Sequence, residues 1–385
     1  MISFMPNEDE ISFVDVAKSF AIEHLRPRSR LIEETGEVPD DMAGKLQELG
    51  FTTLELLESF DGLELPLVSQ VQVLEALSFG DLAAVQGLPG FNETASFIRA
   101  NPENPLFVSL KDKRPTGSLL VNPFHHSLTI QTNRNGYRLN GVSIPVKMGE
   151  VSTLLIIAGV DENREDVLLL LEKETHQWKS VIGDRRLGLL ASKCARLQFD
   201  QLEVPEDCVL ARGEAARQVT RDALARIRIL EAAKEVGTMA AALAYATEYT
   251  AGRKAFGQEI AKFQGVSFTA AQMAIQTQGA RNLVWHAAKK LDDQEPDAIQ
   301  ASLSALHFAH RAVRFVTDSA VQLLGGHGYV QDHPVEKWMR DAQAQVNLWE
   351  SETELLVKSG EYLLLGKERR ETDDILRTGT SAATG

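Results

Sequence analysis

The 385-residue chain contains only two cysteines, Cys194 and Cys208. Without a second pair, neither a disulfide framework nor a zinc site is suggested, and no other metal site is predicted. Two small buried or half-buried side chains are the simpler interpretation of these cysteines. A run of about eighteen apolar residues is also missing, so no membrane insertion is expected. The amino terminus lacks the basic start and the apolar core of a secretory signal, which favours the cytoplasm as the location.

Positive charge is scarce as well. The chain carries 40 lysines and arginines against 54 aspartates and glutamates, which gives a net charge of −14. This charge repels nucleic-acid phosphate, and no run of basic residues interleaved with aromatics offsets it locally. No nucleic-acid partner is therefore expected.

Proline is nearly absent from the second half of the chain, where only Pro296 and Pro334 follow Pro205. Long helices can occupy this half, because proline interrupts a helix interior. Apolar residues recur there at helical spacing, and Pro334 suits the first turn of a helix. Helices are predicted after Pro334 and over residues 213–254, about 266–291, about 297–324 and 353–365. Four or five long antiparallel helices form a bundle.

The preceding part of the chain has a different pattern. Short apolar runs separated by turn residues predict β-strands at residues 127–132, 153–159, 166–171 and 197–204. An Asn-Gly pair at residues 135–136 favours a hairpin, because both residues tolerate positive φ. The first hundred residues return to helical spacing, and Gly50 is placed to end the second of these helices.

The order helical, β, helical indicates separate units rather than an alternating α/β sheet. We therefore predict a multidomain α+β fold with four parts. They are an N-terminal helical domain (1–114), a middle β-barrel domain (115–212), a C-terminal four-helix-bundle domain (213–370) and a loose polar tail (371–385).

Three local patterns in the C-terminal half are each ordinary when taken alone. Arg253–Gln264 places an arginine, two aromatic residues and an amide after a long helix, as amphipathic helix ends often do. Gln322–Tyr329 is rich in glycine, which lets a backbone approach a phosphate closely, although most such stretches are turns. Asp332–Asp341 leads into an acidic run that begins at Glu350, and such a run is usually a solvated helix face.

In this order and at this separation, the three patterns together resemble the acyl-CoA dehydrogenase family. Its C-terminal domain carries the motifs R-x-x-F-G-x-x-I-x-x-F-Q, Q-x-x-G-G-x-G-Y and R-D-A, which read here as Arg253–Gln264, Gln322–Tyr329 and Arg340–Ala342. The resemblance reaches the middle of the chain through Tyr137–Gly141 and Arg186–Gly188. It implies the three-domain fold, an FAD cofactor, an acyl-CoA substrate and an electron-transferring flavoprotein as acceptor.

The resemblance also implies roles for single residues at the cofactor. Arg253 and Phe256 are expected to contact the pyrophosphate and adenine side of FAD, and Gln264 belongs to the same cluster. A guanidinium suits a pyrophosphate, and an aromatic ring can pack on adenine. A second set, expected to approach the same dinucleotide from a neighbouring subunit, consists of Gln322, Gly325 and Gly326. A homo-oligomer, arranged as a dimer of dimers, is therefore expected.

The family reaction needs a base beside the α carbon of the thioester, while the flavin accepts hydride from the β carbon. Glu350 is the candidate base, and burial is expected to raise its pKa towards that of the proton it takes. Arg228 stands at the place of a family active-site arginine, although an arginine on a long helix is often exposed. Some family members carry a glutamate just before that arginine, and Ile227 occupies this place here.

The assignment of Glu350 depends on one alignment. In the family, the glutamate of a Y-E-G-T loop lies nine positions after the arginine of R-D-A, and that position is Trp349 here. An alignment with one extra residue places Glu350 in the loop and also aligns Leu355 with an apolar position. The ungapped alignment leaves no base.

The middle domain departs further from the family. The T-E-P and G-S-D motifs are absent, and Pro145 stands where an aromatic residue is expected to stack on the flavin. Two alternatives to the dehydrogenase therefore remain. One is a flavin oxidase on the same scaffold. The other is a subunit that has lost catalysis or flavin and serves as a structural partner in a mixed oligomer.

Overall fold

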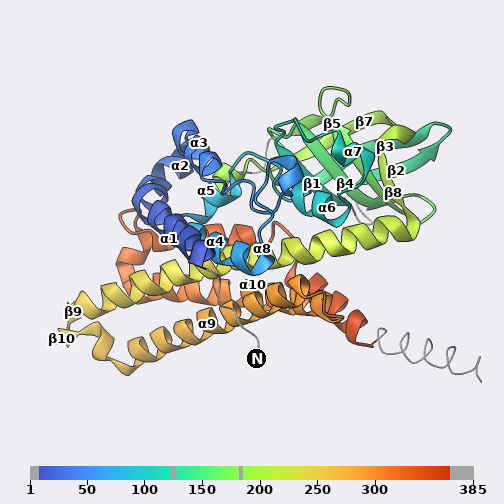
Figure 1. Cartoon of the computed structure of the whole chain (residues 1–385). Helices are drawn as coiled ribbons and strands as arrows, with labels where there is room; N and C mark the ends of the chain where they lie inside the picture. The colour runs from blue at the N-terminus through green and yellow to red at the C-terminus, as the bar shows by residue number, and fades with distance from the viewer. Residues whose placement is uncertain (1–7, 123–126, 182–184, 365–385) are drawn as a thin grey trace, which may run out of the picture.

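The computed structural model describes residues 8–122, 127–181 and 185–364 (Figure 1). These residues form a helical N-terminal part, two β-sheets and a long helical bundle, so the predicted fold class is confirmed. The predicted tail (371–385) lies outside the described residues. None of the helices in the described ranges combines the length and the apolar composition needed to cross a bilayer.

The N-terminal part packs short helices around one buried helix, α4 (Leu67–Gly80). Most residues of α4 are buried, on every side of the helix, so its sequence shows no amphipathic stripe. Helix α3 (Asp40–Glu48) ends near Gly50, whose φ of 77° confirms the predicted left-handed glycine. The other helices are α1 (Glu8–Phe20), α2 (Ser29–Thr35), α5 (Leu82–Gln86), α6 (Thr94–Ala100) and α7 (Pro105–Val108).

Two four-stranded sheets pack face to face in the middle of the chain and enclose one apolar core. Sheet A has the order β1 (Gly117–Asn122), β4 (Leu154–Val160), β5 (Asp166–Glu172) and β8 (Val209–Arg212). Sheet B has the order β2 (Leu128–Asn133), β3 (Gly136–Val146), β7 (Ala195–Pro205) and β6 (Lys179–Val181). The predicted hairpin at Asn135–Gly136 is confirmed as the turn between β2 and β3.

The burial of the two sheets explains their sequences. Sheet A lies between sheet B and the helices, so that both of its faces are buried. Its strands β4 and β5 accordingly consist of nearly uninterrupted apolar residues. Strand β2 of sheet B alternates between buried and exposed positions, as a strand with one solvated face does.

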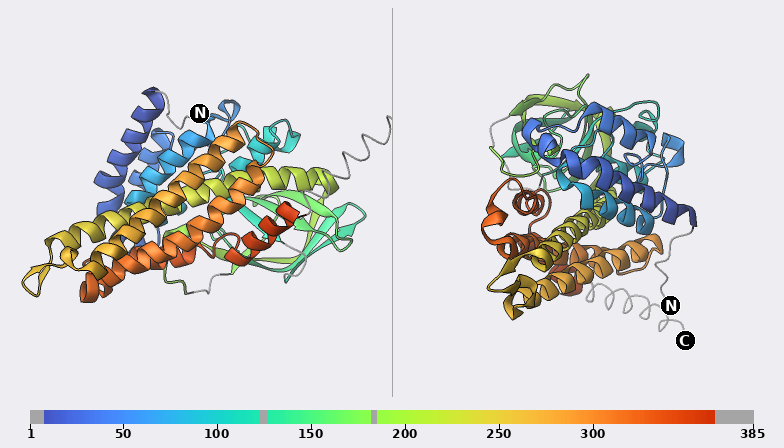
Figure 2. Two further views of the ribbon diagram at one scale, coloured as in Figure 1. Left: turned by 90° about the horizontal axis from the view of Figure 1, so that it is seen from below. Right: turned by 90° about the vertical axis from the view of Figure 1, so that its left-hand side faces the viewer.

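The C-terminal bundle confirms the predicted helices. It consists of α8 (Gly213–Gly252), α9 (Gln264–Asp292), α10 (Ala298–Leu324), α11 (Val335–Gln345) and a helix over residues 352–364. Helix α8 is 40 residues long and runs beneath both the sheets and the N-terminal helices, with α9 and α10 alongside it (Figures 1 and 2). A Cβ at Gly237 would lie 2.3 Å from the Glu75 carbonyl oxygen, so glycine lets α4 approach α8 closely.

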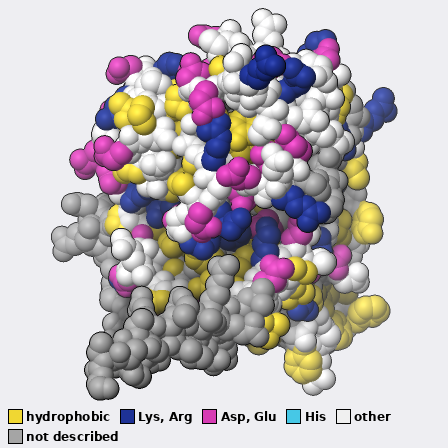
Figure 3. All heavy atoms as spheres, turned by 90° about the vertical axis from the view of Figure 1, so that its right-hand side faces the viewer, with side chains coloured by type: hydrophobic (Ala, Val, Ile, Leu, Met, Phe, Trp, Pro, Cys, Tyr) yellow, Lys and Arg dark blue, Asp and Glu magenta, His cyan; other side chains and the backbone are white. Residues whose placement is uncertain are grey.

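Charged side chains of both signs are interspersed with apolar ones on the face at the sheet end of the molecule (Figure 3). Exposed ion pairs of this kind contribute little to stability.

A buried ion triad is different. The Lys337 ammonium of α11 donates to Asp81 at 2.6 Å and to Asp341 at 2.7 Å, and all three side chains are at most 2% exposed. Asp341 also accepts the backbone N–H of Leu189 at 2.7 Å. The triad therefore ties α11 to the start of α5 and to the β6–β7 connection.

We expect Lys337→Met to lower the free energy of unfolding by about 3–5 kcal/mol, because it leaves two carboxylates buried without a cation. The matched control is Lys113→Met, which breaks an exposed pair with Glu172 and should cost less than about 1 kcal/mol. Urea unfolding followed by circular dichroism measures both values. Equal losses in the two variants would show that the triad does not hold the three parts together.

Candidate active site

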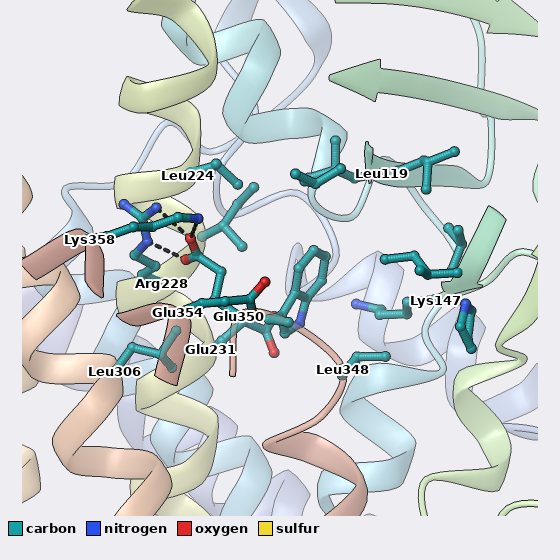
Figure 4. A pocket seen from close by; sticks show the side chains of 17 residues that line it. Leu119, Lys147, Leu224, Arg228, Glu231, Leu306, Leu348, Glu350, Glu354 and Lys358 are labelled. Atoms are coloured by element: carbon teal, nitrogen blue, oxygen red, sulfur yellow. Dashed lines mark hydrogen bonds and ion pairs between the residues drawn. The ribbon is translucent and has the colours of Figure 1, made fainter. Parts of the chain in front are cut away.

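A cavity of about 200 Å³ lies between the sheets and the bundle, with Glu350 on its wall (Figure 4). Apolar side chains of β1 and β3 form one side of the cavity, and Pro145 is among them. Helix α8 and residues 348–358 form the other side. The indole Nε1 of Trp349 is buried at this wall and has no hydrogen-bond partner within the described residues. Three carboxyl groups line the cavity, those of Glu231, Glu350 and Glu354.

Two cations hold the Glu350 carboxylate. Arg228 of α8 donates from Nε and Nη2 to the two carboxylate oxygens, at 2.5 and 2.9 Å. The Lys358 ammonium donates to the same carboxylate, and Figure 4 shows both cations pointing at it. Arg228 is 5% exposed, so it is not a solvated helix arginine. The structure therefore brings together the predicted base and the predicted active-site arginine.

The pKa of Glu350 does not follow the expectation from burial. Burial alone would raise it, but the hydrogen bonds and charges of Arg228 and Lys358 outweigh burial and lower the pKa to about 2. The expectation of a raised pKa is wrong for this arrangement, because two cations pair with the buried carboxylate. Glu350 is ionised at neutral pH, as a base must be, but it is a weak base while both cations hold it.

A buried histidine fixes the loop that carries Glu350. The Nδ1 of His310, on α10, lies 2.7 Å from the carboxylate of Glu235 on α8, and its Nε2 lies 3.1 Å from the backbone carbonyl oxygen of Glu350. A carbonyl oxygen only accepts, so Nε2 carries a proton. Burial opposes the charged form of His310, but the charge and hydrogen bond of Glu235 outweigh burial and raise its pKa. His310 thereby connects two bundle helices to the loop.

A groove with a volume of about 380 Å³ lies at the other end of the bundle. It is beside the hairpin of β9 (Lys254–Ala255) and β10 (Gln258–Glu259). Four of the six residues predicted to bind the dinucleotide line this groove. They are Arg253, Gln322, Gly325 and Gly326. Phe256, which is 95% exposed on the hairpin, and Gln264, the first residue of α9, do not line it.

The glycines of the groove leave room for a ligand. Gly325 has a φ of 60° and a ψ of −131°, a conformation that glycine alone adopts readily. A Cβ placed on Gly325 or Gly326 would meet no other protein atom within 4 Å. A phosphate can therefore approach this backbone, and the Arg253 guanidinium lines the same groove. The groove fits the pyrophosphate side of FAD.

The groove and the cavity of one chain lie far apart. Arg228 sits within α8 and Arg253 directly follows that helix, so their separation is roughly 37 Å at the helical rise per residue. This distance exceeds the reach of one dinucleotide. Arg253 and the Gly325–Gly326 pair, which were expected to come from different subunits, line one groove of one chain. Which subunit supplies them to a shared dinucleotide stays a prediction.

Sequence reasoning missed Lys358 and His310. Lys358 lies outside the family motifs. For His310, the sequence pattern predicted only that the residue lies on a long helix. One signal was available, because Arg228, Glu231 and Glu235 are spaced by three and four residues and so place three charges on one face of α8. All three are buried, at 5%, 1% and 0% exposure.

Two family models match this chain. The model described as the acyl-CoA dehydrogenase N-terminal domain matches residues 7–98, and that described as the acyl-CoA dehydrogenase C-terminal domain matches residues 217–348. Together they cover more than half of the chain. An acyl-CoA dehydrogenase of Bacillus subtilis is 28% identical over 376 residues, which are 93% of this chain and 99% of that relative.

Two solved structures have the same fold. The butyryl-CoA dehydrogenase of Megasphaera elsdenii superimposes with a TM-score of 0.83 at 26% identity, over 94% of this chain and 100% of that one. A chain from a structure described as the electron transferring flavoprotein of Acidaminococcus fermentans gives a TM-score of 0.83 at 25% identity, with the same coverage. The similarity therefore spans all three parts of the fold.

The ion pair at Glu350 makes stability depend on pH. A carboxyl whose pKa is lowered on folding stabilises the folded state above its unfolded pKa, and this contribution is lost as the pH falls through the folded pKa. For Glu350 the loss runs from an ordinary pKa of 4.5 down to about 2. The free energy of unfolding of the wild type, minus that of Glu350→Gln, should therefore shrink as the pH falls through this range in urea titrations.

The same comparison in a Lys358→Met background isolates the second cation. Without Lys358, the folded pKa of Glu350 lies closer to 4.5. The difference in free energy of unfolding between the proteins with and without Glu350→Gln should therefore be smaller and should vanish at a higher pH. An unchanged pH dependence in this background would show that Lys358 does not act on the Glu350 carboxyl.

Proposed function

The chain belongs to the acyl-CoA dehydrogenase family, and from that premise we propose that it removes hydrogen from the α and β carbons of an acyl-CoA thioester. It is an FAD-dependent oxidoreductase that acts on CH–CH bonds. The observation that carries the finer proposal is the buried Glu350 carboxylate in a largely apolar cavity beside α8. A carboxylate in such a place can take a carbon-bound proton only from a substrate that reaches the cavity.

Glu350 takes the α proton. It is ionised beforehand, because its pKa is about 2. Its two cations favour the charged form and so oppose proton uptake, and they differ in mobility. The Arg228 side chain is 7% exposed and fixed by two hydrogen bonds, whereas the Lys358 side chain is 42% exposed. Movement of Lys358 into solvent when substrate enters raises the basicity of Glu350, while Arg228 keeps the carboxylate in place.

FAD, when bound, supplies the acceptor for the hydride that leaves the β carbon. Arg253, Gln322, Gly325 and Gly326, which line the groove, would hold its pyrophosphate side. The apolar wall from β1 and β3 keeps water from the cavity in which Glu350 works. His310 holds the loop of Glu350 in position against the bundle through its hydrogen bond to the backbone carbonyl oxygen of Glu350.

A second copy of the chain completes the site. The groove of one chain is too far along α8 to share a dinucleotide with the Glu350 cavity of that chain, so a neighbour supplies the groove. Helix α9 supports such an association, because it exposes Phe268 and Ile275 by 61% and 68%. The assembly proposed is a homotetramer built as a dimer of dimers, and its electron acceptor is an electron-transferring flavoprotein.

Replacement of the base tests the catalytic assignment. Glu350→Gln should lower the rate of flavin reduction by an acyl-CoA, followed anaerobically, by about 10²–10⁴-fold, because the base is lost. Flavin content should not change. The matched control is Glu352→Gln, whose carboxylate pairs with Arg314 and does not line the cavity, and it should retain the rate. A loss of less than about tenfold in Glu350→Gln would refute the base assignment.

Gly326→Val tests the dinucleotide groove. A Cβ at this position meets no protein atom within 4 Å, and the valine side chain extends into the groove. FAD affinity should therefore fall roughly tenfold or more while the melting temperature is retained. Gly44→Val on α3, where a Cβ is equally free, should bind FAD normally. Fluorescence titration of the apoprotein with FAD measures both. Normal binding by Gly326→Val would place the dinucleotide elsewhere.

A further inference from the structure

A second, smaller cavity of about 90 Å³ adjoins the Glu350 cavity. It lies between α8 and the N-terminal helices, and the two cavities share three lining residues, namely Lys147, Ile227 and Glu231. An acyl group whose α carbon lies at Glu350 therefore has this space within reach for its far end. The volume is enough for a short group and too small for a long chain.

Two buried ion pairs line the second cavity. The Lys147 ammonium donates to Glu93 at 2.5 Å, and the two side chains are 3% and 6% exposed. The Lys234 ammonium donates to Glu231 at 2.6 Å, and these side chains are 8% and 1% exposed. All four residues line the cavity. A space meant for a saturated hydrocarbon chain would not be lined in this way, because an apolar group cannot replace the water that charged groups lose.

The pair on α8 is fully engaged by neighbouring amides. Glu231 accepts from Gln86 at 2.5 Å and from Gln345 at 2.8 Å, and Lys234 also donates to Gln86 at 3.1 Å. Lys147 differs. Its ammonium has three N–H donors, and within the described part of the chain only Glu93 accepts from it. Lys147 also lines the Glu350 cavity, so its unused donors are available to a substrate.

We infer that the acyl group of the substrate is short and carries a neutral hydrogen-bond acceptor near its end, such as a hydroxyl or a carbonyl oxygen, which Lys147 binds. This rests on the proposed function. A neutral group is favoured because each charged residue of the wall already has a partner, namely Lys147 with Glu93, Lys234 with Glu231 and Glu55 with Arg226. A substrate carboxylate would add a charge that nothing in the wall balances. Lys147 is thus a specificity residue of the reaction.

The test compares two thioesters of equal size on the FAD-loaded enzyme. In 4-hydroxybutyryl-CoA a hydroxyl stands where pentanoyl-CoA has a methyl group. The kcat/KM for flavin reduction should favour the hydroxyacyl thioester by at least about tenfold, since a hydrogen bond to a charged donor is gained. Octanoyl-CoA, which exceeds the cavity, and succinyl-CoA, which brings a carboxylate, should both be poorer substrates than 4-hydroxybutyryl-CoA.

A double variant, Lys147→Met with Glu93→Gln, removes both charges of one pair together and so avoids an unpaired buried carboxylate. The ratio of kcat/KM for 4-hydroxybutyryl-CoA to kcat/KM for pentanoyl-CoA should fall to within about twofold of unity in this variant. Its melting temperature and flavin content check that it is folded and loaded with FAD. A preference that survives in this variant would overturn the role of Lys147.

The outcomes separate this inference from the proposed function. Equal use of pentanoyl-CoA or octanoyl-CoA by the wild type would overturn the inference and leave the dehydrogenase assignment intact. Best use of succinyl-CoA would show that the wall recognises an anion and would likewise overturn it. Failure of every thioester to reduce the flavin would overturn the proposed function, and the inference with it.

Discussion

A buried charge needs a partner, and this requirement organises the structure around α8. Within ten positions this helix carries five buried or nearly buried ionisable residues. Three of them pair with a residue from another part of the chain, and the other two, Glu231 and Lys234, pair with each other. The pairs are Arg226 with Glu55, Arg228 with Glu350, Glu231 with Lys234 and Gln345, and Glu235 with His310. The N-terminal helices, the loop of Glu350 and α10 are thereby fixed against one helix.

The same requirement sets a conflict at the candidate active site. The Arg228 pair brings the Glu350 loop to the cavity and holds the carboxylate there, because an unpaired carboxylate would not stay buried. The pair also lowers the basicity of that carboxylate. In the proposed reaction, proton uptake and folding therefore make opposite demands on this interaction, and the exposed Lys358 is the part of it that can be released without unpairing Glu350.

The elements that sequence predicted are those with local signals. Helices α8 to α10 follow from apolar spacing, and the β2–β3 turn follows from Asn135–Gly136. The groove that Arg253, Gln322, Gly325 and Gly326 line was predicted from sequence motifs, and a Cβ on either of these two glycines would meet no protein atom within 4 Å. The sequence of helix α4 shows no amphipathic stripe, because residues on every side of this helix are buried. The partners Lys358 and Lys147 could not be predicted, since they meet the site only through tertiary packing.

Proton abstraction is the step on which this account depends, and it can be measured apart from oxidation. Acyl-CoA incubated anaerobically with enzyme whose flavin has been reduced cannot be oxidised, yet its α proton can exchange with deuterium from D₂O through the base. Mass spectrometry should detect deuterium at the α carbon with the wild type and none above the uncatalysed level with Glu350→Gln. Equal exchange by the two proteins would contradict it, because another group would then be the base.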